Sequence, residues 1–103
     1  MTSKESVIQH LDVAEDPELE ISIVELGLVY DVRIEDKGDI LHAEIDMTLT
    51  SPGCPAAAEI MAATHRAALS TDGIESVHVN LVWSPRWDPK IHASEDARMD
   101  MGI

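Results

Sequence analysis

Hydrophobic and polar residues alternate along three segments of the chain, and a period of two predicts β-strands. The middle segment, 41–50, has the cleanest pattern; its expected inward residues are Leu41, Ala43, Ile45, Met47 and Leu49, with Thr48 among the outward ones. Segment 28–35 alternates on even positions; its expected inward residues are Leu28, Tyr30, Val32 and Ile34. Gly27 is expected to bend the chain before it. A polar turn with Gly38 joins the two segments, so we expect an antiparallel hairpin.

The third alternating segment ends in a tryptophan. Its evenly spaced apolar residues are Val77, Val79, Leu81 and Trp83, so Trp83 is expected in the core. Before this segment, the alanine-rich stretch 55–69 has a helical composition and begins with Pro55, because proline is favoured at the first helical position. A strand, a helical crossover and a further strand in one sheet place the two strands parallel.

Two more helices are predicted near the ends of the chain. The first, 3–13, opens with the spacing of a capping box, and the second, 95–101, has Ser94 as its N-cap and closes at Gly102. The resulting order is α-β-β-α-β-α. It predicts an α+β fold in two layers, with a small mixed three-stranded sheet and helices packed on one face. Residues 1–103 are expected to form a single domain.

The charge of the chain narrows the classes of partner. Seven basic residues against 20 acidic ones give a net charge of −13, which argues against binding to nucleic acid or to an anionic membrane. No apolar run approaches the length that crosses a bilayer, and the first residues lack the pattern of a signal peptide. With one cysteine, no internal disulfide can form. A reducing cytoplasm is therefore the expected location.

That cysteine, Cys54, lies in the segment Leu49–Ala57, between Pro52 and Pro55. If Pro55 is the first helical residue, the thiol lies beside the N-cap, where free N–H groups and the helix dipole favour the thiolate. A thiolate is a nucleophile and a soft metal ligand. A lone cysteine can equally serve as a small core hydrophobe. The residues alone leave both roles open.

Other candidate residues give weaker signals. Asp16 and Glu18 flank Pro17 in a predicted turn, where they could complete a metal site, dock a partner or belong to a solvated surface. The five histidines, of which His42 and His78 are expected to be neighbours, show no compact metal-binding motif. Trp87 lies in a predicted loop, as a lid on the core or as an anchor that binds a partner.

Several well-known motifs are absent from the sequence. The chain has no P-loop, dinucleotide-binding glycine pattern, G-x-S-x-G or C-x-x-C. Nucleotide hydrolysis, dinucleotide binding, esterase chemistry and dithiol redox chemistry therefore lose support. A thiol enzyme that uses Cys54 also loses support, because no histidine is placed by the sequence to act as its base. The chain is not expected to be an enzyme.

Four blocks of sequence occur together in a known order. They are Asp16–Leu19, Ile21–Tyr30, Met47–Pro55 and Leu81–Trp87. In this set the chain closely resembles the metal–sulfur cluster biosynthetic family that includes SufT and PaaD, the MIP18-type iron–sulfur assembly domains. The similarity runs from about residue 5 to the C-terminus. PaaD-type members carry further cysteines in a C-terminal extension, which this chain lacks, so it is more similar to stand-alone SufT-like proteins.

The resemblance implies a factor that helps to deliver iron or iron–sulfur clusters to target proteins. Cys54 matches the family's cluster-associated cysteine, with Thr50, Ser51 and Gly53 around the sulfur, and Asp16 and Glu18 match its acidic turn. The implied partners are the iron–sulfur assembly machinery, apo client proteins and a second copy of the chain in a homodimer. Some relatives are fused to a P-loop ATPase domain, which would here act in trans.

The number of protein ligands limits this hypothesis. An iron–sulfur cluster usually takes four protein ligands, and this chain offers one thiolate. Cys54 is therefore expected to bind iron or a cluster transiently, with the other ligands from another chain or a small molecule. Two alternatives remain: an adaptor that recruits clients while Cys54 is structural, and a PaaD-like accessory subunit of a ring oxygenase.

Overall fold

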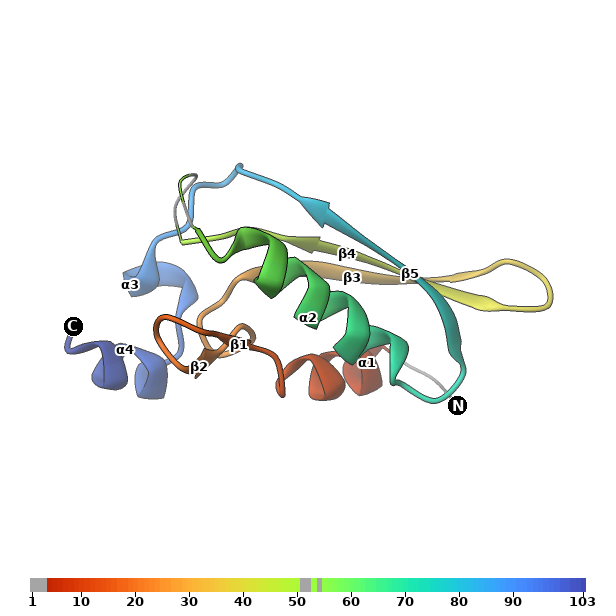
Figure 1. The fold of residues 1–103 in the computed structure, drawn as a ribbon, viewed down its shortest axis with the longest axis horizontal. Helices are drawn as coiled ribbons and strands as arrows, with labels where there is room; N and C mark the ends of the chain where they lie inside the picture. The colour runs from red at the N-terminus through yellow and green to blue at the C-terminus, as the bar shows by residue number, and fades with distance from the viewer. Residues whose placement is uncertain (1–3, 51–52, 54) are drawn as a thin grey trace.

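The computed structural model describes residues 4–50, 53 and 55–103. Its elements follow one another along the chain (Figure 1) as α1 (Lys4–Leu11), β1 (Glu15–Asp16), β2 (Ile21–Ser22), β3 (Val29–Asp36), β4 (Leu41–Met47), α2 (Ala57–Leu69), β5 (Ile74–Leu81), α3 (Pro89–His92) and α4 (Glu95–Met101). Residues 1–3, 51, 52 and 54 lie outside this description.

 The predictions for Ser51 and Cys54 therefore concern residues whose structure is not described.

The main sheet has the strand order β3-β4-β5, with β4 in the centre. Strands β3 and β4 pair antiparallel, and β4 and β5 pair parallel, as the hairpin and the helical crossover predicted. Helices α1 and α2 lie against one face of this sheet, and α3 and α4 lie at the end opposite the β3–β4 turn (Figure 1). The α+β class, the mixed three-stranded sheet and the order of the predicted elements are confirmed.

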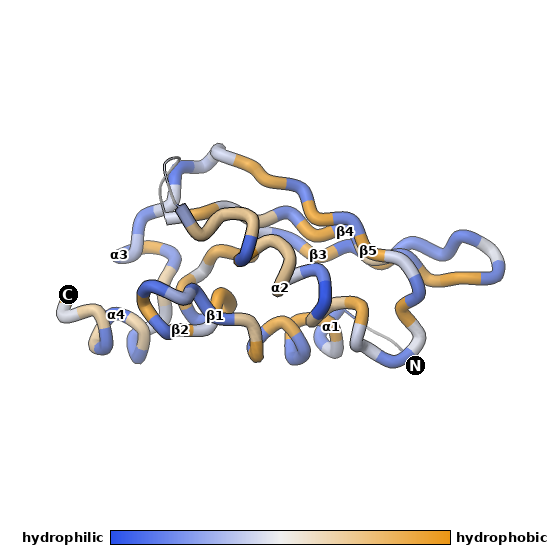
Figure 2. The backbone as a smooth tube through the Cα atoms, in the orientation of Figure 1, coloured by the Kyte–Doolittle hydropathy of each residue, from blue (hydrophilic) through white to orange (hydrophobic). Residues whose placement is uncertain are grey.

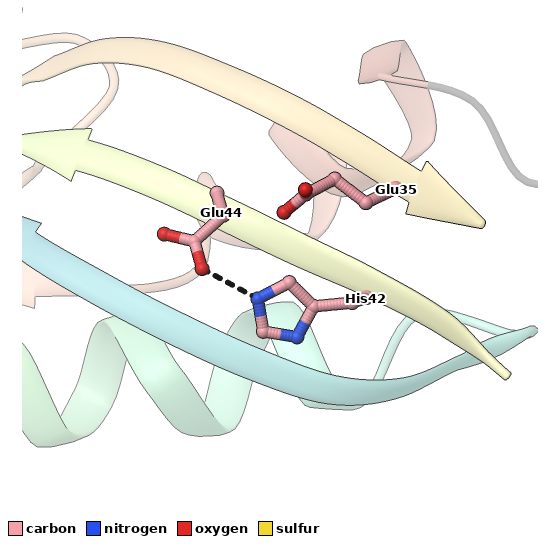
Figure 3. Close-up of side chains that lie close together, drawn as sticks. All are labelled: Glu35, His42 and Glu44. Carbon is pink, nitrogen blue, oxygen red and sulfur yellow. Dashed lines mark hydrogen bonds and ion pairs between the residues drawn. The ribbon is translucent and has the colours of Figure 1, made fainter. Parts of the chain in front are cut away.

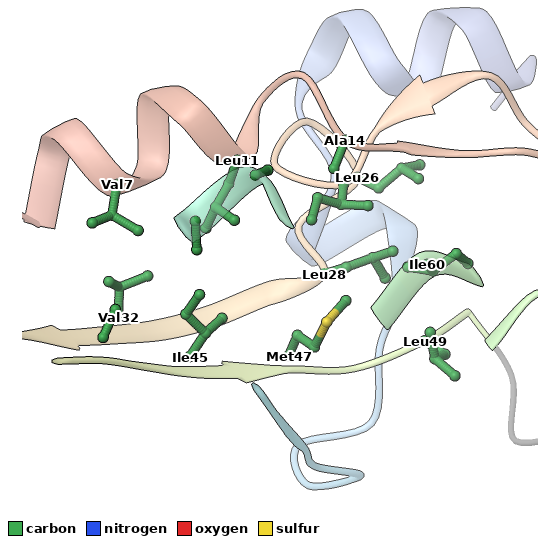
Figure 4. Packing of buried hydrophobic residues seen from close by; sticks show 14 of the residues in the cluster. Val7, Leu11, Ala14, Leu26, Leu28, Val32, Ile45, Met47, Leu49 and Ile60 are labelled. Atoms are coloured by element: carbon green, nitrogen blue, oxygen red, sulfur yellow. The ribbon is translucent and has the colours of Figure 1, made fainter. Parts of the chain in front are cut away.

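The core fills the space between the sheet and these two helices (Figure 4). The predicted inward face of 41–50 is confirmed, since Ala43, Ile45, Met47 and Leu49 are all buried. They pack with Val7 and Leu11 of α1 and Ile60 of α2, among others. The core therefore consists of aliphatic side chains and methionine, in a chain with only 3% aromatic residues.

The other face of the sheet is polar, so hydrophobic and hydrophilic residues alternate along β4 and β5 (Figure 2). Glu44 lies at the centre of this face. Its carboxylate accepts hydrogen bonds from His42 Nε2 at 2.6 Å, Asn80 Nδ2 at 2.8 Å and His78 Nδ1 at 3.1 Å. These bonds, the one to His42 first, lower the pKa of Glu44 to about 2. The expectation that His42 and His78 are neighbours is confirmed.

Two predictions about side-chain direction are wrong because the strands are irregular. A bulge between Val29 and Asp31 leaves Tyr30 without its own place in the ladder, which shifts the pattern of inward residues. The Tyr30 hydroxyl instead donates to Pro85 O at 3.0 Å. Thr48, expected to face outward, is 1% exposed, because β4 ends at Met47 and the Thr48 N–H then donates to Leu28 O.

Two further predictions are wrong because they misplace the boundary of a strand or a helix. Strand β5 ends at Leu81, and the chain then leaves the sheet, so Trp83 is 45% exposed rather than in the core. Helix α2 begins at Ala57, with Ala56 as its N-cap, so Pro55 is not the first helical residue. Ala56 has a ψ of 11°, which is not helical. The prediction that Pro55 opens the helix is therefore wrong, and the one that Cys54 lies beside the N-cap concerns a residue outside the described part of the chain.

The pairing of β1 with β2 and the short helix α3 were not predicted. Two-residue strands are too short to show a period, and α3 has four residues. By contrast, α4 matches its predicted bounds: the Ser94 hydroxyl accepts from Ala97 N–H, and Gly102 adopts the left-handed conformation. In the part of the chain that is described, no helix has the length and apolar character needed to span a bilayer.

Candidate functional site

An open groove of about 550 Å³ lies where the turn after β1 meets the C-terminal segment of the chain. Its lining combines acidic, aromatic and aliphatic side chains from distant parts of the sequence. The lining residues are Asp16, Glu18, Leu19, Thr50, Trp87, Pro89, Asp100, Met101 and Ile103.

The turn after β1 is held by its own first carboxylate. Asp16 is 2% exposed, and its Oδ1 accepts hydrogen bonds from the backbone N–H groups of Glu18 at 2.8 Å and Leu19 at 3.3 Å. Aspartate before proline favours such a turn, because its side chain bonds to the backbone two residues on. Asp16 therefore fixes the turn, and the turn presents the exposed Glu18 at the groove.

Trp87 forms part of the groove wall and is attached to the core. Its indole N–H donates to Leu26 O at 2.8 Å, and its ring packs against the buried hydrophobic cluster. Two roles were open for Trp87, and these contacts correspond to the first of them, a lid on the core. The side of Trp87 that lines the groove stays available for the second role, the binding of a partner.

The C-terminal segment forms one side of the groove, and α4 is held in place at its first turn. Ser94 N–H donates to Glu25 O at 2.7 Å, and the Ser94 hydroxyl donates to the Glu25 carboxylate. Residues 100, 101 and 103 thereby reach the groove. The sequence predicted this helix, but no signal in it indicated which part of the domain the helix would contact.

The groove gathers four of the residues that the sequence singled out, namely Asp16, Glu18, Thr50 and Trp87. Gly53 is exposed and does not belong to the lining. Ser51 and Cys54 lie outside the described residues. In the sequence, Cys54 follows Thr50 by four positions.

The described part of the groove is acidic. Asp16, Glu18 and Asp100 contribute carboxylates, and none of the described residues that line it has a basic side chain. Carboxylate oxygens are ligands for divalent cations, including iron. A thiolate next to such a groove would add the soft ligand that the groove itself does not offer.

The fold and the site together define a small α+β domain. It has an acidic groove and, directly after the groove residue Thr50, a segment that contains the single cysteine. The chain belongs to the iron–sulfur cluster assembly protein family, whose model matches residues 4–81. The resemblance drawn from the four sequence blocks is thereby confirmed.

Two relatives and one solved structure show how far the similarity extends. The Fe-S protein maturation auxiliary factor SufT of Staphylococcus aureus is 42% identical over 85% of this chain and 96% of its own length. The Fe-S protein maturation auxiliary factor YitW of Bacillus subtilis is 39% identical over 97% of this chain and 94% of its own. The crystal structure of a domain of unknown function, DUF59, from Bacillus anthracis has a TM-score of 0.83 and 38% identity, covering 97% of this chain and 92% of that one.

Proposed function

We propose that this protein is an iron–sulfur maturation factor that holds iron or a cluster transiently through Cys54 and passes it to apo client proteins. Membership of the iron–sulfur cluster assembly family supports the general role. Relatives that share most of their length with this chain are named as maturation auxiliary factors, which supports a role other than catalysis.

The observation that carries the proposal is the groove. It brings Asp16 and Glu18 together with Thr50, although more than thirty positions separate the acidic turn from Thr50 in the sequence. Cys54 follows Thr50 by four positions in the sequence. The proposed ligands are the Cys54 thiolate and the Glu18 carboxylate, with Asp16 holding the turn that presents Glu18.

The ligand set is incomplete in one chain, which suits transient binding. Iron–sulfur clusters usually take four protein ligands, so one thiolate and one carboxylate leave positions for a second protomer, a small thiol or the client. A homodimer would supply a second Cys54. Ligands that come from a client make release and delivery one step, since the client replaces the carrier's ligands as it binds.

The partners follow from this exchange. We expect the protein to contact the assembly machinery that supplies the cluster and the apo proteins that receive it, with a P-loop ATPase acting in trans as a further candidate. The adaptor alternative differs in one respect, because it needs Trp87 and the acidic surface but not the thiol. The two hypotheses therefore make different predictions for Cys54→Ser.

Anaerobic reconstitution with iron and sulfide tests the binding step. The wild type is expected to gain visible cluster absorbance, Cys54→Ser to lose it, and Glu18→Gln to hold fewer irons per chain. Glu75→Gln, an exposed position on β5, is the matched control and should behave as the wild type. Equal iron and sulfide content in wild type and Cys54→Ser would overturn the proposal.

A further inference from the structure

The polar face of the sheet carries a cluster of possible metal ligands outside the groove (Figure 3). Glu35 on β3 and His42 and Glu44 on β4 each offer one ligand atom, and the three atoms lie within 4.8 Å of one another. The register explains this, because Glu35 is paired with His42 across the two strands and Glu44 is the next residue on the same face as His42.

The imidazole is oriented by a residue outside the three ligands. His42 Nδ1 lies 2.8 Å from Ser76 Oγ on β5, and its Nε2 faces Glu44 Oε1 at 2.6 Å. A hydrogen-bond partner on one ring nitrogen, with the other directed at the metal, is the usual arrangement of metal-binding histidines. The His42 side chain is 12% exposed and that of Glu44 is 20% exposed, so both are held by their neighbours yet open to solvent.

The second oxygen of Glu44 is fixed as well. Glu44 Oε2 accepts from Asn80 Nδ2 at 2.8 Å and lies 3.1 Å from His78 Nδ1. The exposed His78 could exchange this contact for a place on a metal. The exposed Glu35 carboxylate is turned toward the His42–Glu44 pair (Figure 3), so a small side-chain movement would complete the set.

We propose that Glu35, His42 and Glu44 bind a divalent transition-metal cation of the zinc or iron(II) type on the open face of the sheet. Metal–ligand bonds of about 2.0–2.2 Å separate tetrahedral ligands by roughly 3.4 Å. His42 Nε2 and Glu44 Oε1, now 2.6 Å apart, would therefore move apart by a little under an ångström, and a pair at the 4.8 Å limit would close by a little over one. The cation takes the place of the hydrogen between His42 Nε2 and Glu44 Oε1. Ser76 then accepts from His42 Nδ1–H.

The donor set determines the kind of cation. One imidazole and two carboxylates suit zinc, iron(II) or cobalt(II), whereas copper(I) and iron–sulfur clusters need thiolates. Glu35 and His42 lie one residue from the β3–β4 turn, whereas α3 and α4, which contribute to the groove lining, lie at the other end of the sheet (Figure 1). From His42 to the end of β4 alone is roughly 16 Å of strand. The sheet site is therefore a separate place for a metal, without a thiol.

Calorimetric titration of untagged protein with Zn²⁺ tests the proposal, and Co²⁺ absorption reports the ligand type. In a Cys54→Ser background we expect one equivalent of metal to bind and no sulfur-to-cobalt charge-transfer band. His42→Ala should weaken the affinity at least tenfold, and the exposed His65→Ala on α2 should leave it unchanged. Because Glu35 is exposed, Glu35→Gln should fold normally and also weaken binding, which protects the test against an unfolded His42 variant.

Three outcomes would overturn the inference. They are no binding by the Cys54→Ser protein, equal affinity in folded His42→Ala and His65→Ala, or an affinity that depends on Glu18→Gln, which would place the metal in the groove. None of them bears on the proposed function, which is tested by cluster content with Cys54 present. The two proposals can therefore fail separately.

Discussion

Gly27 and His92 pack so closely that a Cβ on Gly27 would lie 2.1 Å from the His92 backbone oxygen. Gly27 also has a φ of +75°, which other L-residues rarely adopt. This contact joins the bend before β3 to the end of α3. The next helix along the chain, α4, contributes to the groove lining. A glycine at this bend thus serves the site as well as the fold.

Gly27→Ala is expected to destabilise the protein strongly. The left-handed backbone costs about 1–2 kcal/mol for alanine, and displacing the His92 backbone adds to this, for a total above about 3 kcal/mol. Gly38→Ala is the matched control, because Gly38 also has a positive φ but nothing within 4 Å of an added Cβ. Urea denaturation should show the larger loss for Gly27→Ala; equal losses would contradict the contact.

Trp87→Phe is expected to lower the free energy of unfolding by about 1–3 kcal/mol, because it leaves Leu26 O without its indole donor. The phenyl ring keeps most of the packing, so the loss reports mainly the hydrogen bond. Trp83→Phe is the comparison, since Trp83 is largely exposed and should change stability by less than about 0.5 kcal/mol. A larger effect at Trp83 than at Trp87 would show that the assignments of lid and surface residue are reversed.

Ser94→Ala is expected to cost about 0.5–2 kcal/mol, because it removes the N-cap of α4. It also removes the hydrogen bond to the Glu25 carboxylate. A double-mutant cycle with Glu25→Ala, measured by chemical denaturation, should give a coupling energy of at least about 0.5 kcal/mol. Additive losses would mean that the two side chains do not cooperate in holding α4.

Glu44 gives the fold a predictable dependence on acid. Its pKa of about 2 in the folded protein lies below the ordinary value of 4.5. A carboxyl group whose pKa is lower in the folded than in the unfolded protein stabilises the fold at a pH above its unfolded pKa. This stability is lost as the pH falls toward its folded pKa. In the presence of a chelator, Glu44→Gln should therefore be less stable than wild type at pH 7, with a shallower decline between about pH 4.5 and about pH 2. Glu75→Gln should keep the wild-type slope; if Glu44→Gln keeps it too, the network does not hold the carboxylate.

The sequence predicted the parts of the fold that depend on local pattern. The alternation at Ala43, Ile45 and Met47 predicts a strand without any knowledge of the strands that pair with it. Ser94 and Gly102 mark the two ends of α4 through local backbone chemistry alone. The bulge at Tyr30 could not be predicted, because it depends on how β3 is paired with β4.

The candidate site was predicted only in part. The acidic turn and Trp87 have recognisable sequence features, and both line the groove. Asp100, Met101 and Ile103 do not, because their place in the lining depends on how α4 is held by Glu25. The exposure of Trp83 escaped prediction for a similar reason, since periodicity does not show where a strand leaves its sheet.

Transfer of a cluster to an apo iron–sulfur enzyme tests the central claim most directly. The protein is loaded anaerobically, separated from free iron and sulfide, and mixed with the apoenzyme, whose regained activity is measured over time. The account predicts that loaded wild type activates the apoenzyme faster than the same amounts of free iron and sulfide, and that identically treated Cys54→Ser does not. If Cys54→Ser activates the apoenzyme as fast as the wild type, the thiol does not carry the cluster.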